Sequence, residues 1–148
     1  MNMFFQLTLG WFYGHVFEYF AHKYILHDRK RFKRIFKNHF KTHHSISRKN
    51  NMCDKNYNKI ISSKFELISL LVINFLHFPI ILIFPYFYAI LVWSTFSYYL
   101  FHRLSHIHTV WGKKWMPWHY AHHMGKNQHM NWGVRLPIID ILLNTNKL

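Results

Sequence analysis

The sequence predicts an all-α integral membrane protein with about three transmembrane helices and a cytoplasmic helical cap. The first observation behind this prediction is the distribution of the 19 Lys and Arg residues. Residues 1–22 and 65–102 contain none, residues 23–64 contain thirteen and residues 103–148 contain six. The two segments without basic residues are also the most apolar. Positive charge confined between apolar segments is typical of membrane proteins, whereas a nucleic-acid binder needs its charge on a soluble face.

The length of the apolar segments is the second observation. Residues 65–101 would extend over roughly 55 Å as one helix, against a hydrocarbon core of about 30 Å. This length fits two crossings, with a turn near Phe84–Pro85–Tyr86, because proline disfavours the helical conformation for its predecessor. Residues 3–24 supply a further apolar segment. The predicted spans are therefore about 3–24, 65–84 and 86–103, in a single domain 1–148.

The basic segments fix the predicted orientation. An odd number of spans places residues 25–64 and 104–148 on the same side of the bilayer, and both are rich in Lys and Arg. The positive-inside rule makes that side cytoplasmic. We therefore expect an integral protein of a bacterial inner membrane or an endoplasmic reticulum type of membrane. The N-terminus and the Pro85 turn would face outward.

The third observation is that ten of the 14 histidines form four groups, each at or after the cytoplasmic end of a predicted span. Their spacings are HX4H, HX3HH, HX3H and HX2HH. Neutral imidazole is a common ligand of transition metals, and one metal takes about four to six ligands. Five carboxylates and one cysteine leave little else to bind a metal. The sequence predicts a dimetal site at the cytoplasmic face, with these ligands: His22, His27, His39, His43, His44, His102, His106, His119, His122 and His123.

Helical spacing is compatible with this ligand set. At about 100° per residue, His102 and His106 lie on one helix face, as do His39 and His43, and the group His119, His122 and His123 shares another. His22 and His27 are five residues apart, so both reach one centre only if they straddle it or if the helix loosens at its end.

Several other polar residues could support the site. Glu18 lies one turn before His22 and could hold its imidazole in the ligating tautomer; it could instead pair with Lys23 or face a polar cavity. His108 and His129 are either additional supporting groups or solvent-facing side chains. Asn131 could act through a water molecule or make a turn with Gly133. His77, in the middle of a predicted span, is either a substrate contact or a hydrogen-bonded helix histidine.

The motifs together resemble the fatty acid hydroxylase and sterol desaturase superfamily, over roughly residues 11–145. The resemblance lies in these segments: Glu18 to His27, His39-x-x-x-His43-His44, Tyr98-x-x-x-His102-x-x-x-His106, His119-x-x-His122-His123, and Asn131 to Asp140 followed by Thr145. Members are integral membrane enzymes with a histidine-bound di-iron centre. They use O2 and supplied electrons to hydroxylate or desaturate lipids. The match at its C-terminal end makes Asp140 a further candidate supporting residue.

The resemblance implies an O2-dependent lipid hydroxylase with two Fe ions, which Zn could replace in purified material. Its partners would be the membrane, a lipid substrate and a separate electron-donor protein, since the sequence has no nicotinamide or flavin fingerprint. The group HX3HH departs from the HX2HH of the lipid 2-hydroxylases. A carotenoid hydroxylase, a lipid desaturase with the same type of site and a non-catalytic metal-binding membrane protein therefore stay open as alternatives.

Overall fold

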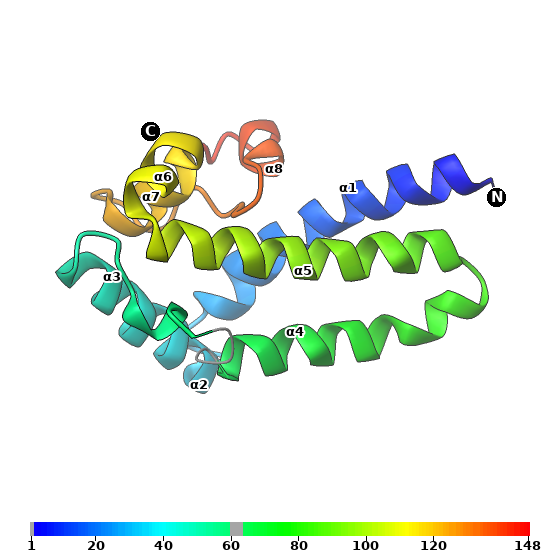
Figure 1. The fold of residues 1–148 in the computed structure, drawn as a ribbon, viewed down its shortest axis with the longest axis horizontal. Helices are drawn as coiled ribbons and strands as arrows, with labels where there is room; N and C mark the ends of the chain where they lie inside the picture. Colours follow the sequence, from blue (N-terminus) through cyan, green and yellow to red (C-terminus); the bar gives the residue numbers. More distant parts are fainter. Residues whose placement is uncertain (1, 60–63) are drawn as a thin grey trace.

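The structure, a computed structural model, describes residues 2–59 and 64–148, and every regular element in this part of the chain is a helix. The prediction of an all-α fold is confirmed. Three long segments dominate: α1 (Met3–Ala21), α4 (Lys64–His77) continued by the 3₁₀ helix η4 (Phe78–Leu82), and α5 (Pro85–Ile107). In Figure 1, α4 and α5 run antiparallel and α1 crosses α5, with the N-terminus and the α4–α5 turn at the same end.

The connection between α4 and α5 follows the proline rule. η4 ends at Leu82 and α5 begins at Pro85. Phe84 between them has φ −134° and ψ 70°, outside the helical region. Proline is well suited to the first turn of a helix, because the amide hydrogen that it lacks would have no intrahelical partner there. The turn predicted at residues 84–86 is confirmed.

Two glycines allow α1 to lie directly against α5. A β-carbon at Gly14 would meet Oγ of Ser94 at 2.6 Å, and one at Gly10 would meet the side chain of Ile90 and the carbonyl of Phe87. Small residues four apart on one helix face let two helix backbones approach closely, and they are common between helices in membranes. This close packing holds α1 and α5 together as a pair.

Short helices form a cap at the end of the bundle away from the N-terminus (Figure 1). They are η1 (His22–Leu26), α2 (Lys33–Phe36), η2 (Lys37–His44), α3 (Ser45–Lys49), η3 (Lys55–Tyr57), α6 (Thr109–Trp115), α7 (Pro117–Met124) and α8 (Ile138–Leu142). Residues 60–63, the end of the segment predicted as 25–64, lie outside the described residues. Tyr19, Trp132 and Ile139 form a small hydrophobic core that joins α1 to α8 and the loop before it.

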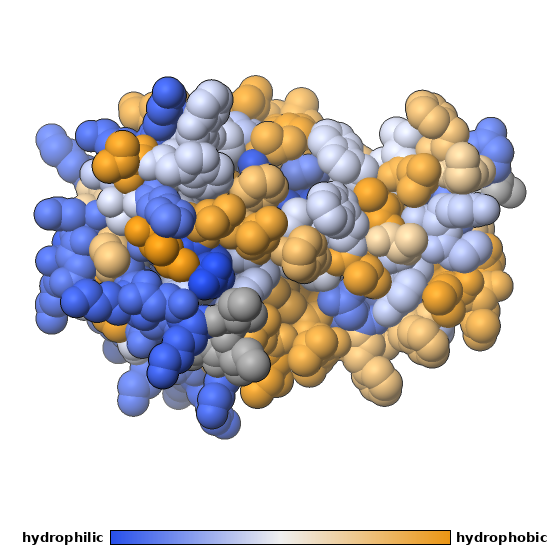
Figure 2. Space-filling view, viewed as in Figure 1, coloured by the Kyte–Doolittle hydropathy of each residue, from blue (hydrophilic) through white to orange (hydrophobic). Residues whose placement is uncertain are grey.

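The surface of the cap around α2 and α3 is hydrophilic, whereas the surface of the long helices is largely apolar. Hydrophilic side chains cover the side of α2 and α3, and apolar side chains extend along α4 towards the α4–α5 turn (Figure 2). α4 contains no buried residue, and three of its apolar side chains, Leu71, Phe75 and Leu76, are more than two-thirds exposed. Among the described residues, one helical segment, Lys64–Leu82, is long and apolar enough to cross a membrane.

Candidate metal centre

Five histidines direct one ring nitrogen each towards a common point. These nitrogens all lie within 4.8 Å of one another. We call the set cluster I: His22, His27, His39, His44 and His122. The Nε2 atoms of His22 and His44 lie 3.0 Å and 3.2 Å from Nε2 of His39. The number of imidazoles falls within the four to six ligands that a transition metal takes, so cluster I could hold one metal ion.

A second group lies beside the first. Nitrogens of His43, His102, His106 and His123 also lie within 4.8 Å of one another. His119 adjoins them, with its Nε2 3.4 Å from Nε2 of His106 and its ring centroid 4.6 Å from that of His123. We call these five residues cluster II. Each of its members is at most 8% exposed, so cluster II could hold a second metal ion in a site closed to bulk water.

Both clusters depend on π-helical turns. η1 (His22–Leu26) and η2 (Lys37–His44) are π-helices, in which hydrogen bonds join residues five apart. The amide of His27 accordingly donates to the carbonyl of His22 at 3.2 Å. This wider turn places His27 over His22, and in η2 it brings His39 and His44 into the same cluster. The helix loosens at its end, as the HX4H spacing requires if both histidines reach one centre.

The consecutive histidines do not stay together. His43 belongs to cluster II and His44 to cluster I, while His122 belongs to cluster I and His123 to cluster II. The grouping of His39 with His43 that an α-helix would give is therefore replaced by His39 with His44. The rings of His43 and His44 are 5.9 Å apart and those of His122 and His123 are 5.4 Å apart. Two adjacent pairs, each divided between the clusters, hold the clusters side by side.

Backbone carbonyls orient the imidazoles of cluster I. Nδ1 of His22 lies 2.6 Å from the carbonyl oxygen of Trp132, and Nδ1 of His122 lies 2.7 Å from that of Met130. A carbonyl can only accept, so each Nδ1 carries the hydrogen and donates it. In a neutral imidazole the lone pair is then on Nε2, which is the nitrogen that these two side chains supply to the cluster.

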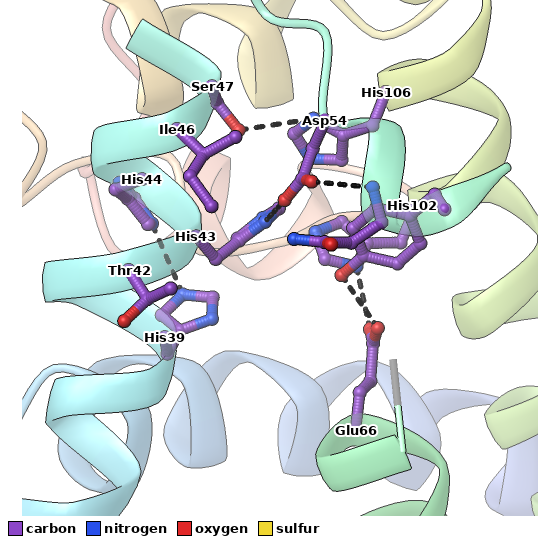
Figure 3. A network of polar contacts seen from close by, with 12 residues as sticks. His39, Thr42, His43, His44, Ile46, Ser47, Asp54, Glu66, His102 and His106 are labelled. Carbon is purple, nitrogen blue, oxygen red and sulfur yellow. Dashed lines mark hydrogen bonds and ion pairs between the residues drawn. The ribbon is translucent and has the colours of Figure 1, made fainter. Parts of the chain in front are cut away.

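Carboxylates orient two imidazoles of cluster II (Figure 3). Nδ1 of His43 donates to Oδ2 of Asp54 at 2.9 Å, and Nδ1 of His102 donates to Oε1 of Glu66 at 2.6 Å. A third imidazole, His106, has Nδ1 2.8 Å from the carbonyl oxygen of Met52. All three are left with a lone pair on Nε2. A carboxylate behind a ligating histidine fixes the ring and makes its other nitrogen more basic.

Several imidazole nitrogens of the two clusters have no hydrogen-bond partner among the described residues. Within the described residues, Nε2 of His43, His102 and His122 and both ring nitrogens of His27 and His123 are buried and form no hydrogen bond. A buried polar atom without a partner costs about 1–3 kcal/mol. Several such atoms in one place destabilise the fold unless a bound cation accepts their lone pairs. The arrangement therefore fits bound metal ions.

Burial also sets the protonation state. Together with neighbouring imidazoles, burial lowers the pKa of His27 to about 2 and that of His122 to about 3. Burial likewise lowers the pKa of His39, His44 and His123 well below the ordinary value. These five imidazoles are therefore neutral at pH 7, which is the form that binds a metal.

The predicted supporting residues take different places. Glu18 accepts from Nε of Arg135 at 2.6 Å and from the amides of Val134 and Arg135, and the group behind His22 is the Trp132 carbonyl instead. Asp140 accepts from the amides of Trp132 and Gly133 at 2.8 Å and 2.7 Å. Both carboxylates thus hold the loop that presents Trp132 to His22, rather than the imidazole itself.

The other three candidates lie outside the ligand sets. Asn131 has φ 58° and exchanges two hydrogen bonds with the backbone of Lys147, so its role is the turn. His129 is exposed, with its ring centroid 5.8 Å from that of His27 at the edge of cluster I. His108 is exposed at the junction of α5 and α6.

Sequence reasoning missed the two carboxylates that contact ligand imidazoles, Asp54 and Glu66. It used the small number of acidic residues only to exclude carboxylate ligands. A signal was present, because an acidic residue such as Glu66 at the start of an apolar segment needs a partner when it is buried. Burial raises the pKa of Asp54, but the hydrogen bonds from His43 and from the amide of Asn56, together with the neighbouring imidazoles, lower it by more, so the pKa lies below its ordinary value. Asp54 is therefore ionised at pH 7.

A cavity of about 750 Å³ extends from the clusters along α1, α4 and α5. At the cap end, its wall includes two histidines of cluster I, His22 and His39, and two of cluster II, His43 and His102. Further along, the wall is mostly apolar. Tyr13 and His77 also line it. The cavity gives an apolar molecule access to both clusters at once.

Comparison of the chain with family models, curated proteins and solved structures gives no match. The two histidine clusters and the cavity beside them are the structural features that point to a function.

Proposed function

We propose that this protein is a membrane-bound di-iron oxygenase that hydroxylates a lipid. The observation that carries the proposal is the pair of histidine clusters, side by side, bordering one apolar cavity. The clusters supply only nitrogen ligands, and imidazole suits Fe and Zn alike. Zn alone has no redox chemistry, whereas two adjacent redox-active ions suit a reaction with O2. The resemblance of the histidine spacing to fatty acid hydroxylases and sterol desaturases supports the same function.

The residues of cluster I and cluster II would each hold one iron ion. When bound, a pair of irons supplies the activation of O2 and the removal of hydrogen from an unactivated C–H bond, which side chains cannot provide. One oxygen atom enters the substrate as a hydroxyl group. The other leaves as water, after two electrons and two protons have been delivered. The chain itself orients the imidazoles, binds the lipid and keeps bulk water out.

The apolar surface supports a membrane location. α4 exposes its apolar side chains over its whole length and buries none, which water would penalise. α1 packs directly against α5, so we propose that both cross the bilayer together with α4. The basic cap would then lie on the cytoplasmic side, and the clusters with it.

A labelling experiment tests this topology. In a Cys53→Ser background, single cysteines at Asn2 or Tyr86 should react with a membrane-impermeant maleimide on intact cells. Cysteines at Asn50 or Lys126 should react only after permeabilisation. Equal reactivity at Tyr86 and Asn50 in intact cells would contradict the three-span arrangement.

Electrons would come from a separate protein. Arg34, Lys37 and Lys41 are exposed on α2 and η2, and η2 carries three of the cluster histidines. A donor with an acidic surface would be attracted to this face and would dock close to cluster I.

The decisive experiment is expression in a lipid-producing host, followed by metal analysis of the purified protein and mass spectrometry of total lipids. We expect close to two metal ions per chain and one lipid class that gains a single oxygen atom. The His106→Ala variant is the matched inactive control. A class that instead loses two hydrogens would identify a desaturase. Two bound metals with unchanged lipids would identify a non-catalytic metal-binding protein.

A further inference from the structure

Polar side chains also line the cavity away from the clusters. Among them are Tyr13 on α1 and Asn74 and His77 on α4. His77 lies beyond Glu66, the residue bonded to His102, by about 16 Å along α4 at 1.5 Å per residue. Apolar side chains line much of the cavity between, Ile68, Val72 and Ile73 among them. A separate polar group at this depth is costly unless it has a use.

The hydrogen bonds of His77 fix the direction of those around it. Its Nδ1 lies 2.8 Å from the carbonyl oxygen of Ile73, to which it can only donate. In the neutral ring, Nε2 is then an acceptor. The hydroxyl of Tyr13 lies 2.9 Å from this Nε2, so Tyr13 donates its one hydrogen to His77. The phenol oxygen keeps its lone pairs and can only accept from a third group.

Asn74, one turn before His77, opens no polar atom of its side chain to the cavity. Its Nδ2 donates to the carbonyl of Leu70 and to Oγ1 of Thr95, both at 2.8 Å. Its Oδ1 is buried and has no hydrogen-bond partner among the described residues. Asn74 and His77 are three residues apart, so they lie on the same face of α4. The oxygen of Tyr13 on α1, which faces His77, is therefore the group that this part of the cavity offers to a ligand as a hydrogen-bond acceptor.

We infer that this part of the cavity binds a hydroxyl group of the lipid substrate, with the phenol oxygen of Tyr13 as the acceptor. A ketone or an ether cannot donate to it, and a charged ammonium group is costly at membrane depth. His77 does not touch the ligand: it is a positioning residue that keeps the Tyr13 oxygen in its accepting role. The inference rests on the proposed function in one respect, since it places the substrate hydroxyl about 16 Å from the carbon that is oxidised.

A pair of probes tests the polarity of the site. A saturated chain advances roughly 1.3 Å per carbon, given C–C bonds of about 1.5 Å, so 1-tetradecanol spans the cavity. 1-Methoxytridecane has the same number of heavy atoms but cannot donate. Binding of both to the zinc-loaded protein in lipid nanodiscs is measured by competition with tritiated tetradecanol. We expect the alcohol to bind about 3- to 10-fold more tightly, as one net hydrogen bond gives.

Two variants and a control distinguish the loss of this hydrogen-bond acceptor from a general loss of packing in the cavity. Tyr13→Phe should reduce the preference for the alcohol to about one. His77→Phe frees the Tyr13 hydrogen to donate, so the ether should gain affinity relative to the alcohol, a change that a loss of packing would not produce. Tyr86→Phe, which removes a hydroxyl outside the cavity, should leave the preference unchanged.

The zinc-loaded protein does not turn over, so the outcome is independent of oxygenase activity. Equal binding of the two probes to wild-type protein carrying both metals would overturn the hydroxyl site and leave the proposed function standing. A preference for the alcohol that survived in Tyr13→Phe would also overturn it. Protein that binds the alcohol selectively but holds no metal would support the hydroxyl site and contradict the oxygenase.

Discussion

Cluster I and cluster II each gather five imidazoles, but the groups behind these imidazoles differ in charge. In cluster I, His22 and His122 donate to the neutral carbonyls of Trp132 and Met130. In cluster II, two imidazoles donate to the carboxylates of Asp54 and Glu66. A carboxylate makes the imidazole in front of it a stronger ligand and adds negative charge near the metal. Cluster II should therefore bind its metal more tightly than cluster I.

The difference also suggests a division of roles. His106, His119 and His123 of cluster II are fully buried, as is His122 of cluster I. Cluster I has His129 at its edge, exposed on the cap, and lies beneath the basic face of η2. The metal that we expect to be held more weakly would thus be the one nearer to the surface proposed for electron delivery.

The largest expected effect comes from removing one ligand of either cluster. His122→Ala should empty cluster I and His106→Ala should empty cluster II, and each should lower lipid oxidation by more than about 100-fold, the upper end of what loss of a supporting residue causes. Metal content by mass spectrometry and oxidised lipid by chromatography measure the two effects. His108→Ala, at an exposed position, is the control. Full metal and turnover after either cluster substitution would refute the ligand assignment.

Titration with a chelator should distinguish the metal affinities of the two clusters in the wild-type protein. We expect one metal to leave at a roughly 10- to 100-fold lower chelator concentration than the other, because only cluster II has carboxylates behind its ligands. The metal released from the protein is measured by the absorbance of a coloured chelator. His122→Ala should lack the easily removed metal and His106→Ala the resistant one. A single release step, or the reverse assignment, would break the comparison.

Glu66→Gln should make the metal affinity of cluster II more similar to that of cluster I. The substitution keeps the shape of the side chain and a hydrogen-bond acceptor for His102 but removes the charge. We expect metal affinity in cluster II to fall by about 10-fold, with cluster I unchanged. Ser69→Ala, which removes a hydroxyl that donates to the carbonyl of Phe65 on the same helix, is the matched control on α4. An unchanged release profile would show that the carboxylate does not tune the metal.

The smallest effect on metal binding is expected for Glu18→Gln. Glu18 reaches cluster I only through the loop that carries Trp132, so metal affinity should change by less than for Glu66→Gln. The stability of the fold should decrease more, because Arg135 would lose a buried ionic partner, a change that typically costs about 3–5 kcal/mol. Thermal unfolding followed by tryptophan fluorescence measures the stability. A 100-fold loss of metal from cluster I without loss of stability would instead place Glu18 directly behind a ligand.

Much of the fold and the ligand set could be predicted from the sequence, because the relevant patterns are local. The alternation of apolar and basic segments predicts the long helices, and Pro85 marks the turn between two of them. The spacing of the histidines picks out all ten residues that the structure gathers into clusters I and II. Each of these features depends on residues within a few turns of one another, where helical periodicity is a reliable guide.

The division of those histidines between two clusters was decided by the tertiary structure. Adjacent residues such as His43 and His44 point to different clusters because η2 is a π-helix, and no feature of the sequence distinguishes its wider turn from an α-helical one. The groups behind the ligands were also beyond local reasoning: Glu66 meets His102 across two helices, and the Trp132 carbonyl meets His22 across most of the chain. Such contacts depend on how α1, α4 and α5 pack, and packing joins residues whose distance along the chain carries no information about their distance in space.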